Sequence, residues 1–123
     1  MKPMTKEQFV EVASRLAESV YDFHVRFDAS GIHEEDEEAI MGHVRNRVPI
    51  LVEEVGEHCK AVNHNNLIEA AKEAADVAYV ALGTLLTLGQ YGGRYGHFVV
   101  EKNNKKTPET HHIGEAGKAI ASG

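Results

Sequence analysis

The chain has 123 residues, a formal net charge of −6 and a single cysteine. This length predicts one domain over residues 1–123, with a core small enough that a second copy would help to stabilise it. The acidic balance argues against a general nucleic-acid or anionic-membrane binder, because such proteins use clustered Lys and Arg to neutralise phosphates. No segment has the ~20 apolar residues of a membrane span or the apolar stretch of a signal peptide. We therefore expect a cytoplasmic protein that binds neither nucleic acid nor membrane.

Helical periodicity begins near the N-terminus. Thr5 and Gln8 have the spacing of a capping box, and apolar residues then recur at helical spacing as far as Phe27. We expect a first helix from about Thr5 to Phe27. His24 falls on its apolar face, which favours a core histidine over a metal ligand.

An acidic segment follows this helix. Ser30 and Gly31 interrupt the periodicity, and five acidic residues occupy positions 34–38. A solvated surface is the simpler interpretation of this run, although negative charge also suits the start of a short helix. Pro49 fits best in the first turn of the next helix, where its missing N–H costs nothing, and a kinked continuation from the preceding segment is the alternative.

Two acidic pairs lie on the next two predicted helices. Glu54 and Glu57 are three residues apart on the first helix, and Glu73 and Asp76 have the same spacing on the second. Residues three apart share one face of a helix. At about 100° per residue, both pairs flank apolar stripes instead of standing opposite them. A turn around residues 63–66 joins the helices, so antiparallel packing would bring the four carboxylates together.

The apolar stripe of the first of these helices is Val48, Leu51, Val55, Cys59 and Val62, and that of the second is Leu67, Ala71, Ala74, Ala78, Leu82 and Leu85. We expect Cys59 to be a small core residue rather than a reactive thiol. Glu53 and Lys60 fall on the far side of the first helix. Asn66, with Glu69, caps the second helix, and Gly89 ends it.

The segment from Val77 to Leu88 carries no charge and is apolar on nearly all sides. A surface helix of a monomer would keep a polar face, so we expect this segment to pack against a partner subunit. The glycine-rich run that follows Gly89 leads to a short last helix or turn at roughly Tyr95 to Lys105, and then to an ordered tail that frays. No strand alternation and no repeat is seen, so the predicted class is all-α, a compact bundle of about four to five helices.

The four carboxylates suit magnesium, which prefers oxygen ligands and combines a few carboxylates with water and substrate phosphate oxygens. Without a cation the four acids would repel one another and raise the pKa of at least one of them. For either pair alone, ordinary surface spacing is the simpler interpretation. The position of both pairs beside apolar stripes on adjacent helices favours convergence.

A basic cluster lies near the C-terminus at Lys102, Asn103, Asn104, Lys105 and Lys106. Lysine ammonium groups bind phosphate, and asparagine amides donate to phosphate or sugar oxygens. A solvated surface is the simpler interpretation of the cluster alone, but beside an acidic metal site it would complete a polyphosphate cradle. The histidines lack the spacing of a structural zinc site, and no nucleophile arrangement or glycine-rich phosphate loop is present.

The sequence EEVGE at 53–57 followed by EAAD at 73–76 resembles the E-E-x-x-E and E-x-x-D signature of the MazG-like and phosphoribosyl-ATP pyrophosphohydrolase-like proteins, an all-α superfamily of nucleotide pyrophosphohydrolases. The apolar continuation DVAYVALGTLLTLG and the downstream KNNKKTPETH are also similar to this superfamily. The resemblance extends over roughly residues 47–112. The acidic segment before Arg47 departs from the shortest members.

The resemblance implies a homodimer or homotetramer that uses Mg²⁺, with Mn²⁺ as a substitute, to hydrolyse an NTP or dNTP to the monophosphate and pyrophosphate, in keeping the nucleotide pool clean. The implied metal ligands are Glu54, Glu57, Glu73 and Asp76. Glu53 would orient or activate water from outside the ligand set. Asn103 and Lys106 match the downstream motif as triphosphate contacts, with Lys102 beside them.

Two other functions remain open at this point. One is a non-catalytic nucleotide-binding or metal-binding helical module that keeps the ligands but does not turn over. The other is a structural helical bundle whose acidic residues are ordinary solvent-exposed surface residues with no role in binding. Magnesium-dependent release of pyrophosphate separates the enzyme from both.

Overall fold

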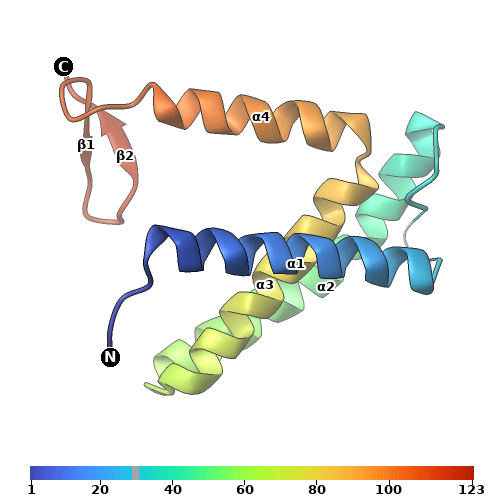
Figure 1. Cartoon of the computed structure of the whole chain (residues 1–123), viewed down its shortest axis with the longest axis horizontal. Helices are drawn as coiled ribbons and strands as arrows, with labels where there is room; N and C mark the ends of the chain where they lie inside the picture. The colour runs from blue at the N-terminus through green and yellow to red at the C-terminus, as the bar shows by residue number, and fades with distance from the viewer. Residues whose placement is uncertain (29–30) are drawn as a thin grey trace. The chain divides into compact units, whose positions relative to one another are not determined.

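The computed structural model describes residues 1–28 and 31–123. Within them it contains four helices and one small sheet (Figure 1), which confirms the predicted all-α class. The chain divides into two compact units at Gly89. The elements of the first unit are α1 (Lys6–Arg26), α2 (Glu37–Asn63) and α3 (Leu67–Thr87), and those of the second are α4 (Gln90–Asn104), β1 (His111–Ile113) and β2 (Ala119–Ala121). The single domain over residues 1–123 stays a prediction.

Helix α1 has the predicted capping box. The Thr5 hydroxyl accepts from the Gln8 N–H at 3.1 Å, and the Gln8 side chain accepts from the Thr5 N–H at 2.9 Å. These bonds satisfy two backbone donors that a helix start would otherwise leave open. His24 is buried, as expected from its place on the apolar face. Ser30, part of the predicted break, lies outside the described residues.

Helix α2 begins earlier than predicted. Asp36 caps it by accepting from the Ala39 N–H at 2.9 Å, and two more acids of the run occupy the first turn, where the helix dipole favours negative charge. Pro49 therefore lies inside one long helix, and its placement in a first turn was wrong. The alternative, a continuous helix through Pro49, holds.

The turn between α2 and α3 is short. Asn65 has a left-handed φ of 54°, and the Asn66 side chain then caps α3 by accepting from the Glu69 N–H at 3.1 Å. At the other end of α3, Gly89 has a φ of 61°, a conformation that glycine adopts without steric cost. The predicted start and stop signals of α3 are confirmed.

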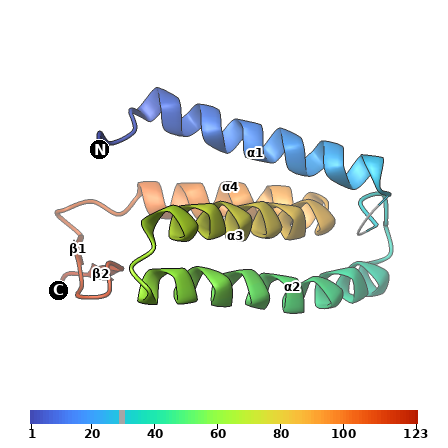
Figure 2. The ribbon, with the colours of Figure 1, turned by 90° about the horizontal axis from the view of Figure 1, so that it is seen from below.

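Helices α2 and α3 run antiparallel and side by side (Figure 2), and α1 packs on α3. The Tyr79 hydroxyl ties α3 to α1 by donating to the Ser19 carbonyl at 3.1 Å.

Within the described chain the buried apolar side chains are few: Val20, Ile40 and Ala61. Within the described residues Cys59 is exposed, so its prediction as a core residue was wrong.

The second unit differs most from the expected structure. Helix α4 begins at Gln90, so it includes the glycine-rich run and starts earlier than the expected Tyr95. The expected fraying tail forms an antiparallel hairpin in which Ile113 pairs with Ala119. Gly117, with a φ of 80°, helps to close its turn. None of the helices within the described part of the chain combines the length and apolar content that crossing a bilayer requires.

Candidate metal centre

Three carboxylates meet on the seam between α2 and α3. Oxygen atoms of Glu54, from α2, and of Glu73 and Asp76, from α3, lie within 4.8 Å of one another. Glu54 and Glu73 are partly buried and Asp76 is exposed. A set of carboxylate oxygens at this spacing suits a hard divalent cation such as Mg²⁺ or Ca²⁺.

The surroundings of Glu54 change the pKa of its carboxyl group. Its pKa is raised above the usual value by partial burial, by a hydrogen bond with Glu73, and by the negative charges of Asp76, Glu73 and Glu53. Both burial and like charges favour the protonated form of a carboxyl group. A bound cation would remove this repulsion, so the residues fit the metal that their chemistry implies.

Glu57 lies outside the group of three and lines a pocket next to it. The pocket has a volume of about 180 Å³, and Glu73 belongs to both the pocket and the cluster. Its polar lining consists of Glu57, Lys60, His64, Asn66, Glu69 and Glu73. The placement of Lys60 on the far side of α2 was therefore wrong, because Lys60 shares this pocket with Glu57.

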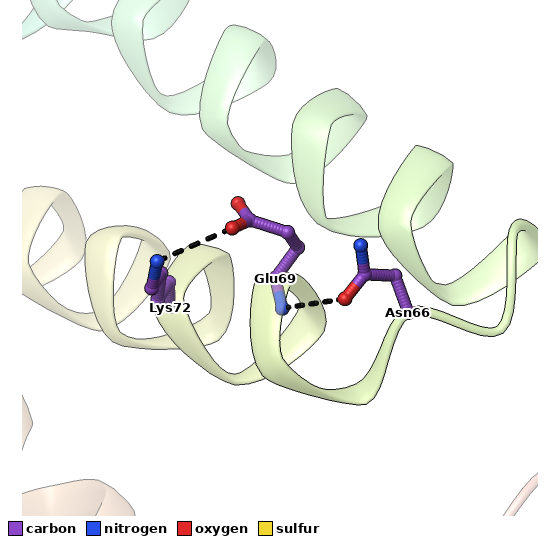
Figure 3. Close-up of polar contacts among 3 residues, drawn as sticks. All are labelled: Asn66, Glu69 and Lys72. Carbon is purple, nitrogen blue, oxygen red and sulfur yellow. Dashed lines mark hydrogen bonds and ion pairs between the residues drawn. The ribbon is translucent and has the colours of Figure 1, made fainter.

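Two interactions organise the α3 side of the pocket (Figure 3). The Asn66 amide oxygen is held by the Glu69 N–H, and in this orientation the Asn66 amide nitrogen points toward α2. The Glu69 carboxylate pairs with the Lys72 ammonium at 3.2 Å. The negative charge of Glu69 is thus already offset by a lysine of its own helix.

Sequence reasoning missed the role of Arg47, which clamps α2 to α3 near the cluster. Its guanidinium donates to the Thr84 hydroxyl and to the Val80 carbonyl, each at 3.0 Å. Burial lowers the pKa of Arg47. The available signal was an arginine two helical turns before Glu54, directly before the apolar residues 48–52.

Four further predicted site residues do not belong to the group of three carboxylates: Glu53, Lys102, Asn103 and Lys106. Glu53 is exposed on α2. In the second unit, the Asn103 amide donates to the Val99 carbonyl at 2.9 Å and accepts from the Lys106 ammonium at 3.2 Å. Asn103 therefore positions Lys106, and Lys102 lies exposed in the last turn of α4. The part that the second unit plays in the site stays a prediction.

A family model described as phosphoribosyl-ATP pyrophosphohydrolase matches residues 20–89, which is more than half of the chain. The match includes the whole of α2 and α3 and thus all the carboxylates of the candidate centre. No curated protein and no solved structure matches the chain.

Proposed function

The chain belongs to the phosphoribosyl-ATP pyrophosphohydrolase family, and on this premise we propose that it hydrolyses an NTP or dNTP to the monophosphate and pyrophosphate with Mg²⁺. Mn²⁺ would substitute for Mg²⁺, and removal of unwanted nucleotides is the role we assign. The observation that supports this most directly is the meeting of Glu54, Glu73 and Asp76 within 4.8 Å. Three carboxylates from two helices would repel one another without a cation, so their convergence supports a cation site.

The proposed mechanism gives each residue a separate task. A bound Mg²⁺ would supply Lewis-acid stabilisation of negative charge and a more acidic water. Glu54, Glu73 and Asp76 would hold the cation from two helices, and Glu57 extends the carboxylate surface into the adjoining pocket. Glu53, exposed next to Glu54, orients the water. Lys106, held by Asn103, contacts the outer phosphates with Lys102 beside it.

The direct test is magnesium-dependent release of pyrophosphate from a panel of nucleotides. Asp76→Asn and Glu57→Gln should each remain helical and lose nearly all turnover, because each removes one carboxylate from a multi-ligand site. Circular dichroism checks the fold of each variant. Turnover like that of the wild type in Asp76→Asn would contradict the assignment of the metal site. Magnesium-dependent nucleotide binding without any turnover would instead identify a non-catalytic module.

The bond that breaks can be tested separately with water labelled with oxygen-18. Attack near the α-phosphorus places the label in the monophosphate or the pyrophosphate and none in orthophosphate. A phosphatase with the same ligands would release labelled orthophosphate and a nucleoside diphosphate. That result would replace the pyrophosphohydrolase mechanism even if every metal ligand were correct.

We also propose that the chain works as a homodimer or homotetramer. An apolar groove of about 490 Å³ runs between α1 and α3, with Phe9, Val12, Leu16, Ala78, Leu82 and Leu85 among its lining residues. Phe9 is 58% exposed and Leu85 is 40% exposed, so large apolar side chains line a groove open to water. Apolar area of this kind favours association, since removing it from water is favourable.

A further inference from the structure

We propose that Lys60 binds the pyrophosphate end of the substrate, in the pocket that adjoins the three carboxylates. This inference rests on the proposed function and adds to it a residue of the first unit that contacts the phosphate chain. It also gives the substrate a direction. The inner phosphates would lie at Glu54, Glu73 and Asp76, and the outer phosphates would extend along the seam toward the turn between α2 and α3.

The position of Lys60 supports this role. Lys60 follows Glu57 by three residues on α2, so the two side chains share one face of the helix, and both line the pocket. Glu73 lines the same pocket and also belongs to the carboxylate cluster. A group bound in the pocket is therefore an immediate neighbour of a cation held by the cluster.

The charges around the pocket leave Lys60 available for an anion. Glu69 is already paired with Lys72. Glu73 is engaged in the carboxylate cluster, where a cation would neutralise it together with Glu54, and Glu57 is an expected ligand of the same cation. Within the described residues Lys60 makes no ion pair, although three carboxylates line its pocket. An ammonium group on a flexible stem is suited to binding phosphate as a point charge.

The other polar groups and the size of the pocket select a small anion. The Asn66 amide nitrogen points toward α2 (Figure 3), and the first turn of α3 adds the positive end of a helix dipole. At about 180 Å³ the pocket is smaller than the roughly 300–1,000 Å³ of sites that enclose whole small molecules. A pyrophosphate group suits this space better than a complete nucleotide does.

The test compares Lys60→Met with Lys6→Met, a matched control that removes an exposed lysine from α1. Calorimetric titration with Mg²⁺ present would measure the affinity of each full-length variant for pyrophosphate and for a nucleoside monophosphate. We expect Lys60→Met to weaken pyrophosphate binding roughly tenfold to a hundredfold, the range of a charge-assisted hydrogen bond, and to leave monophosphate binding unchanged. Lys6→Met should bind both ligands like the wild type, and Lys60→Arg should recover much of the lost affinity.

The outcomes separate this inference from the proposed function. Unchanged pyrophosphate affinity in Lys60→Met would overturn the role of Lys60, while pyrophosphate release by the wild type would leave the proposed function standing. If Lys60→Met lost affinity equally for pyrophosphate and monophosphate, or only for Mg²⁺, the proposed role of Lys60 would also be overturned. Lys60 would then affect the whole site and would not bind the leaving group specifically. A wild-type protein that neither releases nor binds pyrophosphate would refute both proposals.

Discussion

Glu54 lies among other acidic residues, and its negative charge is costly there because of partial burial and of the neighbouring charges. Its raised pKa means that the folded, metal-free chain binds a proton at Glu54 more tightly than the unfolded chain does. The stability that Glu54 contributes is therefore fully present below its unfolded pKa of about 4.3 and is lost as the pH rises through its folded pKa. The negative charge of Glu54 therefore lowers the stability of the folded chain at neutral pH.

The first prediction follows from the raised pKa of Glu54. In buffer that contains a metal chelator at pH 7, Glu54→Gln should melt at a higher temperature than the wild type. The neutral amide would no longer be repelled by the charges of Glu73 and Asp76. At pH 4 the gain should shrink or vanish, since the wild-type carboxyl group is then largely protonated. Thermal melting followed by circular dichroism at both pH values measures this.

The control for this prediction is Glu11→Gln, which removes one negative charge from an exposed position on α1. It should change the melting temperature little at either pH. If Glu11→Gln and Glu54→Gln behave alike, the effect belongs to the net charge of the chain and not to the cluster.

Single residues with strong local chemistry were the easiest to predict from the sequence. Thr5, Asn66 and Gly89 each act within a few residues of chain, so the sequence contains the whole interaction. Cys59 was predicted wrongly because burial depends on what covers a helix face, and periodicity identifies the face without identifying its cover. The predicted set of four acids includes the three that converge, with Glu57 in the adjoining pocket.

At the scale of the helices, the contact between α2 and α3 depends on the absence of a side chain at Gly83. A Cβ atom there would collide with the Arg47 guanidinium and would lie 2.9 Å from His24 Nε2. Moving the guanidinium away from this Cβ would weaken its hydrogen bonds to the Val80 carbonyl and the Thr84 hydroxyl. Gly83 therefore allows an arginine to join two helices across a partly buried seam.

The second prediction is that Gly83→Ala destabilises the chain by about 1–3 kcal/mol, the usual cost of losing hydrogen bonds to a partly buried polar group. Urea unfolding measures this free energy. The control is Gly42→Ala in α2, where an added Cβ meets nothing within 4 Å. That substitution should stabilise the chain by up to about 1 kcal/mol, because alanine is the better helix former. A stabilising Gly83→Ala would show that Arg47 moves aside at no cost.

Local signals predicted the wrong boundaries for two elements. Pro49 suggested a helix start, but one missing N–H did not outweigh a helix that packs along α3 and is capped at Asp36. The hairpin after residue 110 has strands of only three residues, too short for alternation to be visible. Gly114 and Gly117 were the available signal, since both lie in the turn that joins the strands.

For the molecule as a whole, the uncovered apolar surface is the main feature to explain. The third prediction is that the wild type sediments as a dimer or tetramer at micromolar concentration and that Leu85→Glu shifts it toward the monomer. A charge in the groove between α1 and α3 would have to be desolvated in an interface, which is costly without a partner.

The matched control is Ile68→Glu on the same helix, at a position that is 70% exposed and outside that groove. This variant should keep the sedimentation of the wild type. A wild type that is already monomeric at micromolar concentration would exclude the proposed assembly. Dissociation by both variants alike would place the interface elsewhere on α3.

The short turn between α2 and α3 has a consequence for how fast the chain folds. The two helices that hold Glu54 and Glu73 are consecutive, so bringing them together closes only a small loop and costs little chain entropy. If this hairpin forms in the folding transition state, the carboxylates already repel one another there. Glu54→Gln should then speed refolding in stopped-flow experiments and leave the unfolding rate nearly unchanged. The electrostatic cost of the metal-free cluster would thus limit the rate at which the chain folds, and not the lifetime of the folded state.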